Sequence, residues 1–119
     1  TIIGNQYREI FKLSHTLKYE KKNNITESIQ FLKSKISLED IKLNEKYDII
    51  FYDAFAPSKQ PSMWERKNLE KIFSHMKNNS ILVTYCASGQ FKRDLKSIGF
   101  DVSTLPGPKG KKEMVRATK

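Results

Sequence analysis

The run Tyr47-Asp48-Ile49-Ile50-Phe51-Tyr52 is almost continuous in apolar, β-branched and aromatic residues. Such a run is typical of a strand that is buried on both faces, as in a parallel sheet. The chain continues with Asp53, and Pro57 and Pro61 follow soon after it. These prolines predict a fixed loop directly after the strand.

Beyond this loop the chain alternates between helices and strands. Apolar residues at helical spacing predict a helix over 63–77, which Asn78 and Asn79 would end in the left-handed conformation. A second helix is expected to end at Gly99, and a Pro- and Gly-rich loop over 106–110 precedes the last strand. The strands expected in this half cover 81–86, 101–105 and 112–118.

The chain before Tyr47 gives a weaker pattern. We expect a helix over 5–20, a short strand over 28–34 and a turn that begins at Ser37. Strands that alternate with helices imply right-handed crossovers, so the fold class is α/β with a mostly parallel sheet. The last two strands are joined by a short loop and are expected to be antiparallel. We expect residues 1–119 to form a single domain.

The chain of 119 residues is strongly basic, with 22 Lys and Arg against 13 Asp and Glu. This balance favours a phosphate-rich partner such as a nucleic acid, although scattered lysines can also reflect composition alone. One cysteine, Cys86, cannot form a disulfide within the chain and is expected to be a buried, inert thiol. No apolar run is long enough to span a membrane, and no metal-binding or hydrolase motif occurs, so we expect no membrane association, no metal and a cytoplasmic protein.

The carboxyl ends of parallel strands are where ligands bind in such sheets. Asp53 follows the first strand there, and Phe55 lies in the loop behind it. The carboxylate can accept hydrogen bonds from an amine, and the aromatic ring can stack on a base; the alternative is a carboxylate that only caps the loop. Trp64 is either part of the helix core or a ligand contact. Lysines near the last strand either bind phosphate or are solvated.

Three stretches together resemble a known family. They are Tyr47-Asp-Ile-Ile-Phe-Tyr-Asp-Ala-Phe-Ala-Pro-Ser-Lys-Gln-Pro-Ser-Met-Trp64, Ile81-Leu-Val-Thr-Tyr-Cys-Ala-Ser-Gly89 and Leu105-Pro-Gly-Pro-Lys-Gly-Lys-Lys-Glu-Met-Val-Arg-Ala-Thr118. In this order and spacing they resemble the MnmC-like methyltransferase family, which uses S-adenosyl-L-methionine to complete a modified uridine at the tRNA wobble position. Residues 1–46 agree only in pattern.

The resemblance implies a class I methyltransferase (Rossmann-like) fold, whose last strand is antiparallel. The four strands from Tyr47 onward would be its fourth to seventh, and the strand over 28–34 its third. The family's first two strands and its Gly-rich cofactor turn have no counterpart here. We therefore expect the chain to be the C-terminal portion of a methyltransferase domain, inactive and weak in cofactor binding by itself.

The resemblance also implies the reaction, which is methyl transfer to the amine of 5-aminomethyl-2-thiouridine in tRNA. Asp53 would be the catalytic residue, and a separate FAD-dependent oxidase could act on the same tRNA position. Cofactor contacts are expected from Glu39, Asp40, Asp53, Ala54 and Phe55. Substrate contacts are expected from Phe55, Pro57, Lys59, Trp64, Lys109, Lys111, Lys112 and Arg116. Two alternatives remain: an inactive methyltransferase-like module that binds RNA, and a methyltransferase for small amines.

Overall fold

The computed structural model describes residues 2–119, and the chain divides into two compact units at Ser37 and Leu38. The first unit contains helix α1 (Ile2–Thr16) and a small hairpin of β1 (Asn23–Asn24) and β2 (Gln30–Phe31). The second unit holds all the other elements. The expectation of one domain over 1–119 stays a prediction.

The strand expected over 28–34 is wrong in both length and pairing. Only β2 forms there, and it pairs antiparallel with β1 instead of joining the larger sheet as its third strand. The segment after β2 bonds to the chain before it, because the Glu20 carboxylate accepts hydrogen bonds from the Ser34 hydroxyl and the Lys35 backbone N–H, each at 2.7 Å. These local partners satisfy groups that a sheet neighbour would otherwise bind.

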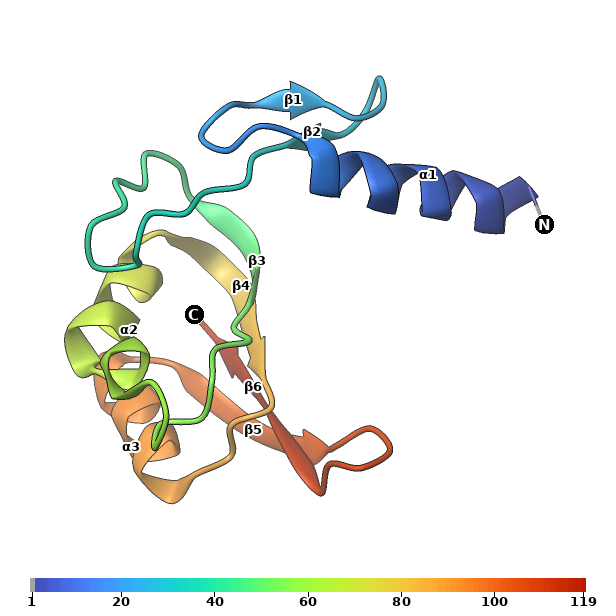
Figure 1. The fold of residues 1–119 in the computed structure, drawn as a ribbon. Coiled ribbons are helices and arrows are strands. Elements are labelled where there is room, and N and C mark those ends of the chain that lie inside the picture. Colours follow the sequence, from blue (N-terminus) through green and yellow to red (C-terminus); the bar gives the residue numbers. More distant parts are fainter. Residues whose placement is uncertain (1) are drawn as a thin grey trace. The chain divides into compact units, whose positions relative to one another are not determined.

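The second unit is built on a four-stranded sheet in the order β3-β4-β6-β5 (Figure 1). Its strands are β3 (Tyr47–Phe51), β4 (Met76–Thr84), β5 (Asp101–Pro106) and β6 (Glu113–Thr118). β3 and β4 are parallel, whereas β6 lies between β4 and β5 and is antiparallel to both. Three strands therefore point one way and the last strand points the other way, which confirms the expected mostly parallel sheet.

Helices cover one face of this sheet (Figure 1). They are a 3-10 turn η1 (Pro61–Trp64), α2 (Arg66–Ser74) and α3 (Gly89–Ile98). Fully buried side chains from each layer meet in the core, namely Leu69, Met76, Leu82, Leu95 and Val115. The core therefore spans α2, α3 and the central strands, and it fixes the strand ends at which a ligand would bind.

The helix expected over 63–77 is interrupted and ends early. Glu65 has an extended backbone, with ψ at 143°, and this separates η1 from α2. α2 stops at Ser74 because Met76 already begins β4. Asn79 does adopt the left-handed conformation, with φ at 64°, but it lies inside β4 where the pairing with β3 shifts register. The sequence signal was thus a strand irregularity rather than a helix end.

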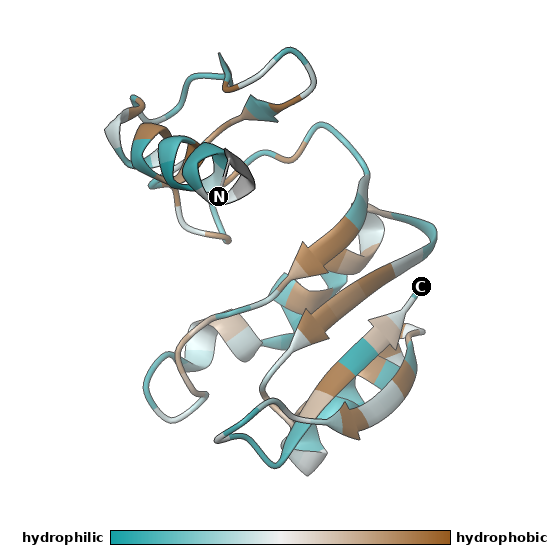
Figure 2. Cartoon of the chain, turned by 90° about the vertical axis from the view of Figure 1, so that its right-hand side faces the viewer, coloured by the Kyte–Doolittle hydropathy of each residue, from teal (hydrophilic) through white to brown (hydrophobic). Residues whose placement is uncertain are grey.

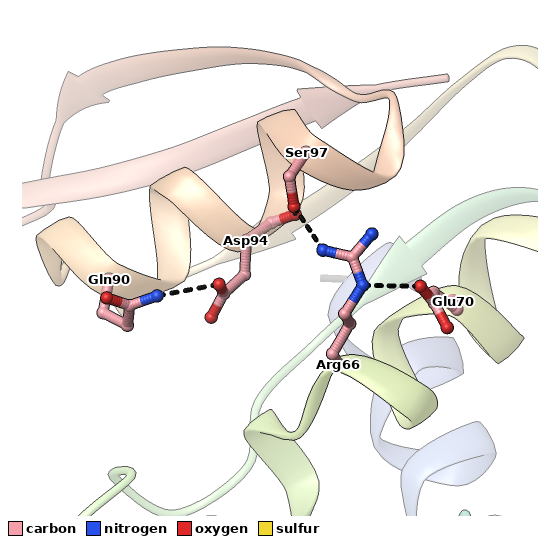
Figure 3. A network of polar contacts seen from close by, with 5 residues as sticks. All are labelled: Arg66, Glu70, Gln90, Asp94 and Ser97. Carbon is pink, nitrogen blue, oxygen red and sulfur yellow. Dashed lines mark hydrogen bonds and ion pairs between the residues drawn. The ribbon is translucent and has the colours of Figure 1, made fainter.

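Helix α3 ends at the glycine that the sequence predicts, and Ser88 caps its start. The Ser88 hydroxyl accepts a hydrogen bond from the Phe91 backbone N–H, and Gly99 ends the helix with φ at 125°. A polar network ties α3 to α2, because Arg66 donates to Glu70 within α2 and to the Ser97 hydroxyl of α3 (Figure 3). This link lies on the outer surface of the two helices and keeps them side by side.

The opposite face of the sheet is open within residues 38–119, and it is apolar along β3 and β4. Figure 2 shows β3 and β4 coloured as hydrophobic in the stretches that lead to their arrowheads. Phe51 is 75% exposed and Ile49 46% exposed on this face.

Among the described residues, no helix is long and apolar enough to cross a membrane.

Candidate functional site

Asp53 lies at the carboxyl end of β3, where parallel strands of this fold class bind ligands. Its side chain is exposed and lines three neighbouring cavities of about 250, 470 and 410 Å³. The sequence placed the acid at this edge, and the structure confirms the position. A carboxylate shared by several cavities can contact two different ligands at once.

Two aromatic residues of the core hold the loop after Asp53 through hydrogen bonds. The Tyr52 hydroxyl donates a hydrogen bond to the Met63 carbonyl, and the Trp64 indole N–H donates to the Phe55 carbonyl at 2.8 Å. Tyr52 and Trp64 meet edge to face with ring centroids 5.3 Å apart. Burial, together with the nearby Glu39 carboxylate, raises the pKa of Tyr52, so the phenol stays protonated and remains a donor. The loop is thus bonded at both of its ends.

Trp64 therefore has a structural role in this molecule. Its side chain is 9% exposed and also packs edge to face on Phe91 of α3, with ring centroids 4.9 Å apart. Of the two interpretations of Trp64 from the sequence, part of the core or a ligand contact, this environment agrees with the first. A direct substrate contact by Trp64 stays a prediction, which its place in the lining of the 410 Å³ cavity permits.

Phe55, unlike Trp64, has an exposed ring. Its ring is 76% exposed, although its own carbonyl is bonded to the buried Trp64. Phe55 lines the 470 Å³ cavity together with Asp53 and Ala54. A fixed backbone with an exposed aromatic ring is suited to stacking on a flat heterocycle, because little conformational freedom is lost on binding.

The loop between β5 and β6 brings a cation to the acid. Lys111 lines the 410 Å³ cavity with Asp53 and Pro57, although the two charged residues are far apart in the sequence. The loop is closed by hydrogen bonds from the Gly107 N–H to the Lys112 carbonyl and from the Lys111 N–H to the Pro108 carbonyl. A Cβ on Gly107 would lie 2.4 Å from the Lys111 carbonyl oxygen, so this tight closure requires glycine.

The other predicted basic contacts are exposed but are spread over the surface. Arg116 lies on β6 opposite Val83 of β4, on the face away from the buried Val115 and Ala117. Lys59, Lys109 and Lys112 are exposed in loops. The structure thus places Lys111 and Asp53 in the lining of one cavity. The remaining cations lie elsewhere on the surface and are candidates for contacts with a large anionic partner.

Glu39 and Asp40 lie in a turn that α2 holds. The Asn68 side chain donates to the Glu39 carboxylate at 3.2 Å, and the Lys71 ammonium donates to the Leu38 carbonyl at 2.7 Å. The structure does not bring this turn into the cavities that Asp53 lines. The expected cofactor contacts of Glu39 and Asp40 therefore stay predictions.

Two residues at the end of β4 were not predicted as site residues. Tyr85 lines two of the cavities with Asp53, and its side chain is 47% exposed. Cys86, expected to be buried, is half-buried and lines the 410 Å³ cavity. Alternation along the strand could have indicated Tyr85, because residues 83 and 85 must face the side opposite to the buried Leu82 and Thr84.

Known proteins resemble the chain both in sequence and in structure. A bifunctional tRNA 5-methylaminomethyl-2-thiouridine biosynthesis protein MnmC from Campylobacter hominis is 35% identical over 103 residues, which is 87% of this chain and 15% of that protein. The MnmC protein of Marinobacter nauticus is 37% identical over 57% of this chain and 11% of its own length. The crystal structure of MNMC2 from Aquifex aeolicus superposes with a TM-score of 0.70 at 25% identity, over 91% of this chain and 34% of that one.

The chain thus spans only a small part of these curated relatives. The structural neighbour supports the class I, Rossmann-like arrangement of the sheet. The family match itself covers residues 3–119 and therefore includes nearly all of the sequence. The chain belongs to the family of S-adenosyl-L-methionine-dependent methyltransferases.

Proposed function

We propose that the protein methylates the amine of 5-aminomethyl-2-thiouridine at the wobble position of tRNA, with S-adenosyl-L-methionine as the methyl donor. The observation that carries the proposal is Asp53, an exposed carboxylate at a parallel strand end that joins a cavity with an aromatic ring to a cavity with a cation. The relatives are named for the biosynthesis of 5-methylaminomethyl-2-thiouridine, the product of this methylation, which supports the choice of substrate.

The residues at this strand end fit one side of the cofactor. S-Adenosyl-L-methionine supplies an electrophilic methyl group on a cationic sulfur. The 470 Å³ cavity offers the Asp53 carboxylate for positive charge and the exposed Phe55 ring for a heterocycle, with Ala54 between them. We propose that these three residues contact the cofactor.

Asp53 would act on the substrate amine. An amine must be neutral to attack, and a carboxylate that accepts a hydrogen bond from one of its N–H groups orients the lone pair. The same carboxylate can accept the proton that nitrogen loses on methylation. The bonded loop behind Asp53 holds the carboxylate in place, which is the main contribution that this chain makes to the reaction.

The exposed basic residues of the loops and of β6 are proposed to bind tRNA phosphates, and one of them, Lys111, lines the 410 Å³ cavity. Lys59, Lys109, Lys111, Lys112 and Arg116 are exposed, and their charge is part of the overall excess of 22 basic over 13 acidic residues. Pro57 and Trp64 would shape the pocket into which the wobble base is turned out.

Two further proposals follow from a tRNA substrate. We propose that the protein acts in the cytoplasm and that a FAD-dependent oxidase acts on the same tRNA position. The curated relatives are named bifunctional, so in them two activities share one chain.

The test is methyl transfer by the full-length protein that contains this sequence, measured on tRNA that carries 5-aminomethyl-2-thiouridine. Asp53→Ala should abolish turnover without changing the unfolding midpoint. Asp48→Ala is the matched control, because Asp48 is also an exposed acid on β3 but pairs with Lys77 at 2.9 Å, away from the strand end. Near-normal turnover of Asp53→Ala would remove Asp53 from the reaction.

The high positive charge also favours an RNA-binding module without catalysis as a second candidate. Calorimetric titration with S-adenosyl-L-methionine separates the two candidates, because only the enzyme needs the cofactor. Binding of tRNA without any cofactor binding by the full-length protein would select the second candidate. A small-amine methyltransferase would instead bind the cofactor but show no salt-dependent affinity for tRNA.

A further inference from the structure

We infer that Tyr85 is a substrate-binding residue that stacks on the nucleobase carrying the reacting amine. The inference rests on the proposed function and adds to it the residue that recognises the base. Its basis is the juxtaposition of Tyr85, Asp53 and Lys111 around one cavity of about 410 Å³.

The sheet register places Tyr85 next to the acid. Phe51 of β3 lies opposite Val83 of β4, and the Tyr52 N–H bonds to the Val83 carbonyl at 2.8 Å. Asp53 and Tyr85 follow two residues later, just beyond the ends of β3 and β4. Because side chains alternate between faces, both point to the face opposite the buried Tyr52 and Thr84. Both accordingly line the same two cavities.

Tyr85 is free to receive a ligand. Its side chain is 47% exposed at the end of a strand whose inward residues, Leu82 and Thr84, are buried. Within the described part of the chain its hydroxyl makes no hydrogen bond, whereas the hydroxyl of the buried Tyr52 is bonded to Met63. A half-exposed ring directly after a paired strand loses little entropy when a flat ligand covers it.

The three groups together match a nucleotide rather than the methyl donor. A nucleotide that bears an amine presents a flat base for Tyr85, an amine for Asp53 and a phosphate for Lys111. S-Adenosyl-L-methionine has no phosphate, and the separate 470 Å³ cavity with Phe55 offers it a ring and the same carboxylate without this lysine. Asp53 would then lie between a base stacked on Tyr85 and the donor near Phe55.

The experiment measures the binding of two tRNAs by the full-length protein, as wild type, as two variants of Tyr85 and as one control variant. One tRNA carries the modified wobble base, and the other is abasic at that position. Wild type should bind the abasic tRNA about 5- to 150-fold more weakly, the range expected for one stacked base. Tyr85→Leu keeps apolar bulk without the ring and should lose most of this preference, keeping only what the amine contact with Asp53 gives, whereas Tyr85→Phe should behave as wild type.

Kinetics and a matched control complete the test. Tyr85→Leu should raise the KM for tRNA by a similar factor and leave the KM for S-adenosyl-L-methionine unchanged. Tyr19→Leu is the control, because Tyr19 is also 47% exposed but contacts Lys33 and Lys35. If wild type methylates tRNA but Tyr85→Leu keeps the full preference for the base, the inference is overturned while the proposed function stands. A raised KM for the cofactor would also overturn it. Absence of methylation by wild type overturns the proposed function, and the inference falls with it.

Discussion

Replacing Trp64 by Phe tests whether the indole N–H holds the loop that carries Asp53. The substitution removes the 2.8 Å bond to the Phe55 carbonyl and reduces the two edge-to-face contacts with Tyr52 and Phe91. The missing hydrogen bond costs about 1 kcal/mol net, and the weakened ring contacts cost about another 1 kcal/mol. We expect the free energy of unfolding to fall by about 2 kcal/mol, which shifts a urea midpoint by about 1 M.

The same change should lower turnover more than stability alone explains. Misplacement of a reacting group by about 1 Å can cost on the order of 100-fold in rate, so a loosened loop should reduce kcat by about tenfold or more. Ile72→Val is the matched control, because Ile72 is 4% exposed on α2, away from the loop. It should cost about 1 kcal/mol and leave kcat unchanged. If Trp64→Phe keeps wild-type kcat, or if its loss of stability stays below about 0.5 kcal/mol, the indole bond does not hold the loop.

Three further predictions concern the loops and the buried phenol. Replacing Lys109, Lys111 and Lys112 by Ala should weaken tRNA binding and flatten its salt dependence by about 0.7 in logarithmic slope for each phosphate that the variant no longer binds; dissociation constants at several salt concentrations measure this, and an unchanged slope would mean solvated lysines. Gly107→Ala should distort the β5–β6 loop, since its new Cβ would lie 2.4 Å from the Lys111 carbonyl, and it should weaken tRNA binding in the same assay; wild-type affinity would contradict the tight loop. The raised pKa of Tyr52 means that above the ordinary phenol pKa of about 10 the unfolded chain loses this proton while the folded chain keeps it, so stability falls as pH rises. Tyr52→Phe should therefore lose less stability than wild type between about pH 8 and 11, and equal shifts in urea midpoint would refute this.

The sequence predicted the elements whose neighbours are close along the chain. β3 and the β5–β6 hairpin appear within a residue or two of their expected bounds. Their signals are a continuous apolar run and a Pro- and Gly-rich turn, both of which act locally. The reversed last strand followed from the short loop before it.

The errors lie where a distant partner decides the structure. Residues 28–34 have a strand pattern, but only Gln30–Phe31 forms a strand, because its partner is Asn23–Asn24. The helix that was expected to reach residue 77 stops at Ser74, since Met76 pairs with Tyr47. Local propensity does not show which segments will pair, because pairing depends on which strand edge is available in the fold.

The candidate site shows the same division. Asp53 and Phe55 were predicted because a strand and a proline loop place them at a sheet edge. Tyr85 was missed because a tyrosine at the end of an apolar run looks like core, and only the β3–β4 register shows that it faces Asp53. The association of Lys111 with this acid likewise depends on the antiparallel return of β6, which brings the loop before it to the end of β4.

These contacts also separate the three kinds of effect that substitutions at the site should have. Asp53 is fixed between a paired strand and a loop bonded to buried aromatic rings, so changes beneath it should act on kcat. Lys111 lies in an exposed loop closed by two backbone hydrogen bonds, so changes there should act on tRNA affinity and its salt dependence. Tyr85 presents an exposed ring directly after β4, and its removal should therefore appear in base-dependent affinity without a change in the salt slope. A Tyr85 variant whose salt slope changed as much as that of the lysine variants would show that the base and the phosphates are not bound by separate groups.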